Sequence, residues 1–200
     1  MCVDKTVLTI LAAIENRPRF DIAVPMRSDP TGLIATFQQR GVAERGFLFP
    51  EELEDIALVK NGGKLSTKTR NALRSNSAET IKHLTAMALK TDEPEMAVRL
   101  LIGLDGVRLP TASCILAWTL PHKWPVIDVR AWRTLARLSQ AGLELEPVGG
   151  LKVRHWTHYF MVVKGVAVAA AMTPQAVDVW LYQHDKSQDA IAETATIPLD

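Results

Sequence analysis

The sequence lacks the features that mark several protein classes. It has only two cysteines among 200 residues, too few for a disulfide framework or a four-cysteine metal site. No apolar run reaches the roughly 18 residues of a membrane-spanning helix. The start, Met1-Cys2-Val3-Asp4, lacks the basic and then apolar order of a signal peptide. We therefore expect a cytoplasmic, intracellular protein without a membrane segment.

The composition that is present is typical of a globular domain. Hydrophobic residues make up 48% of the chain and charged residues 22%. A chain of 200 residues corresponds to one domain. Burial of roughly 70% of the unfolded surface gives such a domain a core without disulfides or metals. We predict a single domain over 1–200, whose lobes the sequence does not separate.

The charged residues are unevenly distributed, although the net charge is only +1. A basic segment (60–74) holds no acidic residue and carries Lys60, Lys64, Lys68, Arg70 and Arg74. Acidic residues precede it at 51–55, and the tail over 185–200 is acidic again. A near-zero total can hide a local basic face. The segment is either a solvated helix surface or a face that binds anions.

The apolar spacing is helical almost throughout, and the fold class we predict is all-α. We predict a proline-rich loop over residues 18–30. The one candidate for a brief strand is Val166 with Val168. Serine, threonine and glycine mark several helix ends, at Asn61-Gly62-Gly63, Ser77 and Thr173-Pro174. Helices are expected at about 7–17, 33–37, 50–61, 65–74, 78–89, 94–104, 110–120, 129–140, 151–164 and 174–184.

The segment over 104–116 indicates a helical hairpin. An apolar helix ends in a tight turn containing Gly106, and a new helix begins at Pro110-Thr111. Backbone N–H groups at the start of that helix can hold an anion such as a phosphate. A plain turn between two helices fits the same pattern.

A second motif follows over 121–133. Pro125 and the apolar pair Val126-Ile127 bring Asp128 to the start of a new helix, where its carboxylate can accept backbone N–H bonds. Helix capping alone would explain an aspartate at such a position.

Together the two motifs carry a resemblance to a known family. L-x-G-V-x-x-x-T-A over 104–112 and P-V-I-D-V-R-A-W over 125–132 resemble the helix-hairpin-helix (HhH-GPD) DNA glycosylase superfamily, with the hairpin at about 94–120 and the aspartate loop and following helix at 121–140. Asp128-Val129-x-x-Trp132 is particularly similar to its oxoguanine-processing branch. The resemblance implies a two-lobed helical bundle with DNA between the lobes and Asp128 as the essential aspartate.

The implied activity is hydrolysis of an N-glycosidic bond in base excision repair. Positive charge builds on the deoxyribose as the bond breaks, and a fixed carboxylate stabilises it and orients water. The partner is duplex DNA with one base flipped into a pocket. Trp124 is the predicted pocket residue. The DNA contacts that we expect are Lys68, Arg70, Gly106, Val107, Arg108, Thr111, Lys123, Arg130 and Arg133.

Departures from the family pattern limit the implied chemistry. Pro110 stands where members that also cut the backbone carry a nucleophilic lysine, so lyase activity through that position is excluded. The chain lacks the cysteines of an iron–sulfur cluster, and we expect no metal and no cofactor. Arg108 replaces the second hairpin glycine. We therefore predict a monofunctional, monomeric DNA glycosylase. The alternatives are a non-catalytic helix-hairpin-helix DNA-binding protein and a helical interaction protein without DNA.

Overall fold

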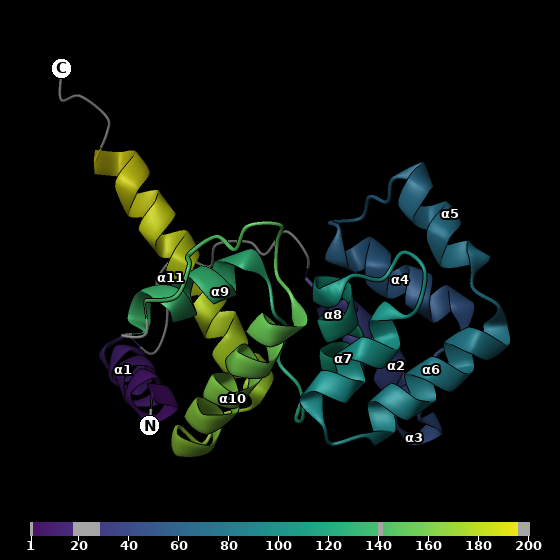
Figure 1. Cartoon of the computed structure of the whole chain (residues 1–200), viewed down its shortest axis with the longest axis horizontal. Coiled ribbons are helices and arrows are strands. Elements are labelled where there is room, and N and C mark those ends of the chain that lie inside the picture. Colours follow the sequence, from purple (N-terminus) through teal and green to yellow (C-terminus); the bar gives the residue numbers. More distant parts are fainter. Residues whose placement is uncertain (1, 18–28, 140–141, 196–200) are drawn as a thin grey trace.

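The computed structural model describes residues 2–17, 29–139 and 142–195, which contain eleven α-helices and no strand (Figure 1). The predicted all-α fold class is confirmed. Most of the predicted proline-rich loop, residues 18–28, and the last residues of the acidic tail, 196–200, lie outside the described residues. The helices are α1 (Cys2–Asn16), α2 (Thr31–Gln39), α3 (Val42–Arg45), α4 (Pro50–Lys60), α5 (Thr67–Ser75), α6 (Ala78–Lys90), α7 (Pro94–Ile102), α8 (Leu109–Thr119), α9 (Val129–Leu138), α10 (Val153–Ala169) and α11 (Pro174–Ala195).

The predicted strand at Val166 and Val168 is wrong. Both residues lie inside α10, where Val162 and Val166 are buried and Val168 is exposed. Burial at i and i+4 is the helical period, and two β-branched residues do not override it.

The short helix α3 was not predicted. It lies between Gly41 and Gly46, which both have positive φ.

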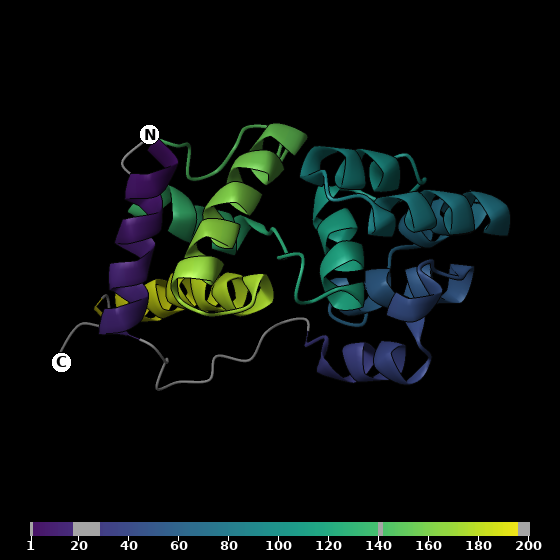
Figure 2. The same ribbon diagram turned by 90° about the horizontal axis from the view of Figure 1, so that it is seen from below.

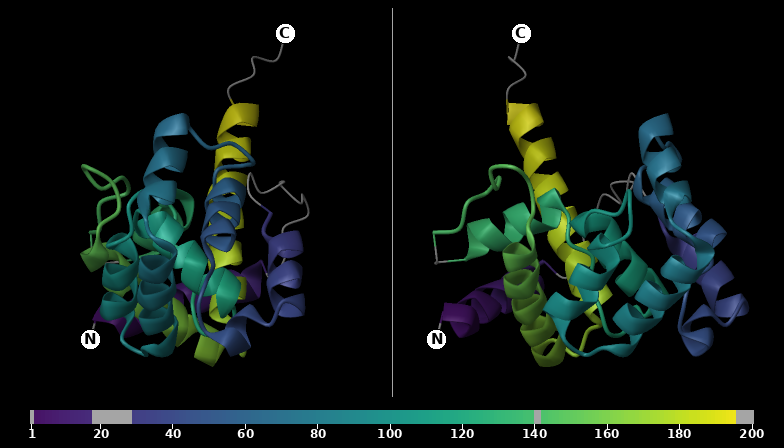
Figure 3. Two further views of the ribbon diagram at one scale, coloured as in Figure 1. Left: turned by 90° about the vertical axis from the view of Figure 1, so that its right-hand side faces the viewer. Right: turned by 45° about the vertical axis from the view of Figure 1, so that its right-hand side comes forward.

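The helices form two groups (Figures 1 and 2). One group holds α2 to α8, and the other holds α1 with α9, α10 and α11. The chain passes from the first group to the second through residues 120–128, and helix α10 of the second group contacts α7 of the first. Figure 3 shows α5 and the C-terminal part of α11 projecting on the same side of the molecule. The connection that carries Asp128 therefore lies where the two groups meet.

Aromatic side chains anchor that connection in the core. Trp124 is fully buried, with its ring 6.2 Å from that of Trp156 and 5.1 Å from that of Phe160, both on α10. Burial of each of these large rings stabilises the fold by on the order of 3 kcal/mol of hydrophobic free energy. The indole of Trp156 also donates to the backbone oxygen of Pro94, the first residue of α7, at 2.7 Å. The two groups of helices are thus tied together next to the aspartate loop.

Side-chain caps define several helix starts as the sequence predicts. Ser77 Oγ accepts the backbone N–H of Thr80 at 3.1 Å, and Thr173 Oγ1 accepts that of Ala176 at 3.1 Å. At the end of α4, the N–H of Gly63 donates to the Leu58 oxygen at 2.9 Å with a left-handed backbone. These contacts satisfy backbone groups that helix ends leave unpaired.

The turn between α7 and α8 is fixed against the neighbouring helices. Asn76 accepts the backbone N–H of Asp105 at 2.9 Å and donates to its backbone oxygen at 3.0 Å. Gly106 has φ +81, and a Cβ there would lie 3.0 Å from the backbone nitrogen of Leu73. Both the conformation and the close approach therefore require glycine at this position.

No helix among the described residues is by itself long and apolar enough to cross a membrane. Helices α10 and α11 meet the length and composition only as a pair, and the pair is bent by 108° at the break. Much of α10 is buried in the core.

Candidate active site

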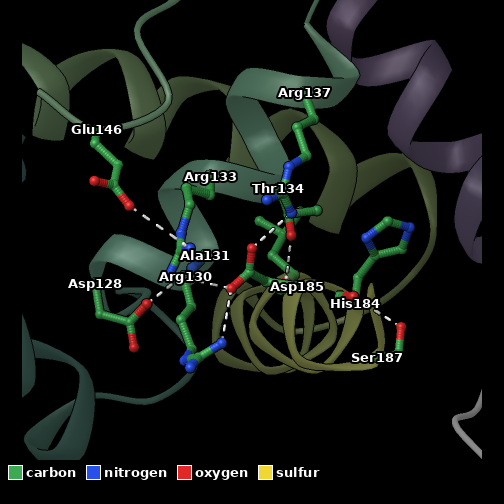
Figure 4. A network of polar contacts seen from close by, with 11 residues as sticks. Asp128, Arg130, Ala131, Arg133, Thr134, Arg137, Glu146, His184, Asp185 and Ser187 are labelled. Carbon is green, nitrogen blue, oxygen red and sulfur yellow. Dashed lines mark hydrogen bonds and ion pairs between the residues drawn. The ribbon is translucent and has the colours of Figure 1, made fainter. Parts of the chain in front are cut away.

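Asp128 is the N-cap of α9, as the sequence predicts. Its Oδ1 accepts the backbone N–H of Ala131 at 2.8 Å, and its own backbone is extended (Figure 4). The carboxylate also lies at the positive end of the helix dipole. The side chain is thereby held in one orientation.

The loop before Asp128 is fixed by two backbone contacts. The N–H of Ile127 donates to Ser113 Oγ at 3.1 Å, and Ser113 Oγ donates in turn to the Pro110 oxygen at 2.9 Å. The N–H of Val126 donates to Asp178 Oδ2 at 3.0 Å. Helices α8 and α11 thus both position the aspartate.

Two adjoining cavities meet at Asp128. The inner cavity has a volume of about 240 Å³ and lies between α2, α4, α8 and α11. The outer cavity, of about 300 Å³, includes Asn61, Pro110 and Arg130. Lys60, Asp128 and Tyr182 line both of them. The further side chains of the inner cavity include Asp29, Thr31, Cys114, Trp118, Gln175 and Asp178.

Asp178 is a second carboxyl group in the inner cavity, and its setting differs from that of Asp128. The residue is buried, with 6% of its surface exposed. Burial raises the pKa of Asp178 well above its ordinary value, and the charge of Asp128 raises it further. The Val126 N–H and the ammonium of Lys60 act in the opposite direction and are the weaker influences overall.

Two other buried groups, Cys114 and Tyr159, are also influenced by these two aspartates. Burial raises the pKa of the Cys114 thiol and of the Tyr159 hydroxyl, and in both cases Asp178 and Asp128 add to the effect. Cys114 is fully buried and keeps its proton, so it is not a nucleophile at neutral pH. The hydroxyl of Tyr159 has no hydrogen-bond partner within the described part of the chain. The site therefore combines carboxyl groups at its edge with several buried groups whose pKa values are raised.

The arginines after Asp128 are engaged in ion pairs within the protein. Arg130, Arg133 and Arg137 surround the fully buried carboxylate of Asp185 on α11, at 3.0, 3.5 and 2.7 Å (Figure 4). Arg133 also lies 3.7 Å from Glu146. Arg130 still borders the outer cavity, whereas Arg133 holds α9 to α11.

Three other predicted site residues make contacts within the protein. Trp124 is fully buried and is absent from the walls of both cavities, because it packs on α10. Val107 is buried, and its N–H donates to the Leu104 oxygen at 3.1 Å. Lys123 pairs with Asp92 at 2.8 Å, donates to the Thr91 oxygen at 2.8 Å and lines neither of the two cavities.

The remaining predicted DNA contacts lie on the surface around the hairpin and α5. Lys68 and Arg108 are exposed, and Arg108 is the N-cap of α8. Thr111 follows in the first turn of α8, and Gly106 forms the turn described above. Arg70 pairs with Glu54 at 3.1 Å, and Arg74 pairs with the same carboxylate. The basic segment is thus partly neutralised.

Sequence reasoning missed Asp178 and Tyr182 on α11 and did not place Lys60 beside Asp128. One signal was present, because Asp178 interrupts the apolar stripe of Val177 and Trp180. Gln175, Asp178 and Tyr182 are spaced i, i+3 and i+7, so they share one helix face. An acid in the apolar stripe of a terminal helix indicates either a buried pair or a site.

The comparisons with known proteins yield no match: no family model, no curated protein and no solved structure matches this chain.

Proposed function

We propose that the protein is a monofunctional DNA N-glycosylase that removes a damaged or mispaired base in base excision repair. The observation that carries the proposal is Asp128, a carboxylate locked by its N-cap bond at the junction of two cavities. The two short motifs that contain the hairpin and this aspartate supply the chemical class. The position of Asp128 between the inner and the outer cavity fits a glycosylase.

Asp128 has the properties that hydrolysis of a glycosidic bond requires. As the base departs, positive charge builds on C1′ and the ring oxygen of deoxyribose. A carboxylate that is already oriented stabilises this charge without further reorganisation. It then accepts a proton from the water that attacks C1′. In this proposal the inner cavity receives the flipped base and the outer cavity the sugar and phosphate.

The test is a panel of duplexes and single strands that carry damaged, deaminated or mismatched bases. Abasic sites are scored after alkali for the wild type and for Asp128→Asn. Because asparagine is as good an N-cap as aspartate, the variant keeps the fold while losing the charge. We expect the loss of charge to lower base release by at least about 100-fold.

The matched control is Asp92→Asn, the same chemical change at a carboxylate that is 91% exposed and pairs with Lys123 away from the cavities. This variant should release bases at the wild-type rate. Base release that survives Asp128→Asn unchanged would exclude the mechanism. Specific, salt-dependent duplex binding with no base released from any substrate would support the non-catalytic alternative.

The proposal also predicts that the enzyme leaves the DNA backbone intact. Pro110 borders the outer cavity with Asp128 and has no amine with which to form a Schiff base. Strand breaks should therefore depend on added base or on an abasic endonuclease, and borohydride should trap no covalent complex. Lys60 is the amine to examine if a complex does form, since it lines both cavities. A trapped complex lost in Lys60→Gln would show a lyase using a different lysine.

A further inference from the structure

Three carboxyl groups line the inner cavity, and two of them, Asp128 and Asp178, lie in unlike settings. Asp128 lies at its edge, where it caps α9 and also reaches the outer cavity. Asp178 is 6% exposed, and its Oδ2 accepts the Val126 N–H at 3.0 Å. A pair of acids with different environments is the arrangement that separates a proton donor from a charged group.

The groups around Asp178 come from every element that surrounds the cavity. Asp128 precedes α9, Lys60 ends α4, and Asp29 precedes α2. Cys114 on α8 and Tyr159 on α10 are buried, and burial raises the pKa of each, so neither adds a charge at neutral pH. Tyr182 lies on the same face of α11. Among the described residues that line the inner cavity, Lys60 is the one cation, and it shares the cavity with the carboxyl groups of Asp29, Asp128 and Asp178.

We propose that Asp178 is a second catalytic residue, a general acid that protonates the departing base while Asp128 remains ionised. The inference rests on the proposed glycosylase function. The geometry that supports it is the shared cavity, in which Asp178 lies deeper than Asp128. The substrates that it favours carry a neutral base, whose nitrogen is a poor leaving group until it gains a proton.

The reaction balances with these two residues and one water. The bond between C1′ and the base nitrogen breaks, and its electron pair goes to the base, which takes the proton of Asp178. Water then forms a bond to C1′ and gives a proton to the carboxylate of Asp128. The products are the free base and an abasic deoxyribose. Asp178 ends as a carboxylate and Asp128 as an acid, and exchange of one proton with solvent restores both.

A positioning role for Asp178 is the competing explanation, because its Oδ2 holds the loop two residues before Asp128. Asp178→Asn separates the two roles. The amide oxygen keeps an acceptor for Val126 in the same volume, whereas the amide does not transfer a proton. Loss of position would slow the release of every base, since Asp128 acts on all of them. Loss of the acid slows only bases that need a proton.

The test compares leaving bases of two kinds in matched duplexes. Guanine alkylated at N7 already carries a positive charge and leaves without protonation, whereas deaminated, oxidised or mispaired bases are neutral. We expect Asp178→Asn to slow release of neutral bases by about 100-fold or more. Release of the cationic base should change by less than a few-fold. The variant should also lose the alkaline limb of the pH–rate profile for neutral bases.

Three results would overturn the proposal. These are equal slowing of the release of both kinds of base by Asp178→Asn, an unchanged alkaline limb of its pH–rate profile, and a wild type that releases cationic bases alone.

Infrared spectra of the protein labelled with ¹³C-aspartate give a readout that needs no substrate. A protonated carboxyl band at neutral pH should disappear in Asp178→Asn. If no base is released but this band is present, the glycosylase function has failed while Asp178 still carries its proton. If bases are released without the band, the acid role alone has failed.

Discussion

At the scale of single residues, neighbours rather than residue type decide what each acid does. Asp128 and Asp178 have the same side chain, but one caps a helix at the edge of two cavities and the other is buried and accepts the Val126 N–H. Burial raises the pKa of Asp178 and so disfavours its charged form. This contrast depends on which elements meet in the folded chain, and local sequence does not contain it.

The buried acid should contribute a loss of stability as the pH rises. The pKa of Asp178 is raised in the folded state, so that state binds a proton that the unfolded state has released. Stability is then fully present below the unfolded value of about 4 and is lost toward the folded value, at up to about 1.4 kcal/mol for each pH unit. We expect Asp178→Asn to remove this loss and to be more stable than the wild type at neutral pH.

Urea unfolding at intervals from pH 4 to pH 8 measures this effect. Asp92→Asn is the matched control, because Asp92 is exposed and the pKa of its carboxyl is lowered by Lys123. Its free energy of unfolding should change with pH over this range in the same way as that of the wild type. If the free energy of unfolding depends on pH in Asp178→Asn as it does in the wild type, another group is responsible for that dependence.

At the scale of elements, one buried carboxylate joins α9 to α11. Asp185 is fully buried and receives three arginines spaced along α9, at 130, 133 and 137 (Figure 4). The residues lie on one face of α9, which explains why a helix so rich in arginine packs closely against a neighbour. Through α9, the same contact helps to fix the helix start that holds Asp128.

Removing the charge of Asp185 should destabilise the whole fold. Asp185→Asn leaves three guanidinium groups around an uncharged side chain, and loss of one partner of a buried ion pair costs about 3–5 kcal/mol. Glu146→Gln is the control, since that carboxylate is 72% exposed and lies 3.7 Å from Arg133. The exposed pair should contribute less than about 1 kcal/mol. Equal effects of the two changes on the free energy of unfolding would refute the central role of Asp185.

Most helices could be predicted from the sequence because their signals are local. Ser77, Thr173 and Asp128 cap helices at the places that their neighbours indicate. The site was less predictable. Trp124 precedes Asp128 in the chain and was expected in the base pocket, but it turns into the core and packs on α10.

The polar cavity wall comes instead from a distant element. Asp178 and Tyr182 lie on α11, about fifty residues after Asp128, and reach the cavity only through tertiary packing. Lys60 reaches it from α4, in the other group of helices. Periodicity indicates which face of a helix is buried, but it does not say what that face meets.

At the scale of the whole molecule, the near-zero net charge conceals separate charged regions. Glu54 neutralises part of the basic segment by pairing with Arg70 and Arg74, while Lys68 on α5 is exposed. Helices α1 and α5 lie at opposite ends of the molecule (Figure 1). In the proposed function, we expect DNA bound across the Asp128 cavities to extend over α5, which projects on the same side of the molecule as the C-terminal part of α11 (Figure 3), and not over α1.

Charge reversal on α5 tests this orientation. We expect Lys68→Glu to weaken duplex binding and to lower the slope of log affinity against log salt by about one unit. Lys5→Glu makes the same change at an exposed residue of α1 and should leave both quantities unaltered. Fluorescence anisotropy over a range of salt concentrations provides the measurement. Equal weakening by both variants would point to a non-specific effect of net charge.

The most direct test of the Asp128 mechanism is the single-turnover rate at which the wild type and Asp128→Asn form abasic sites in the best duplex of the lesion panel. The protein is in excess over DNA, so weak binding does not limit the rate. The proposed role of Asp128 predicts a wild-type rate well above the background and a rate at least about 100-fold lower in Asp128→Asn. Equal rates for the two proteins would contradict that role.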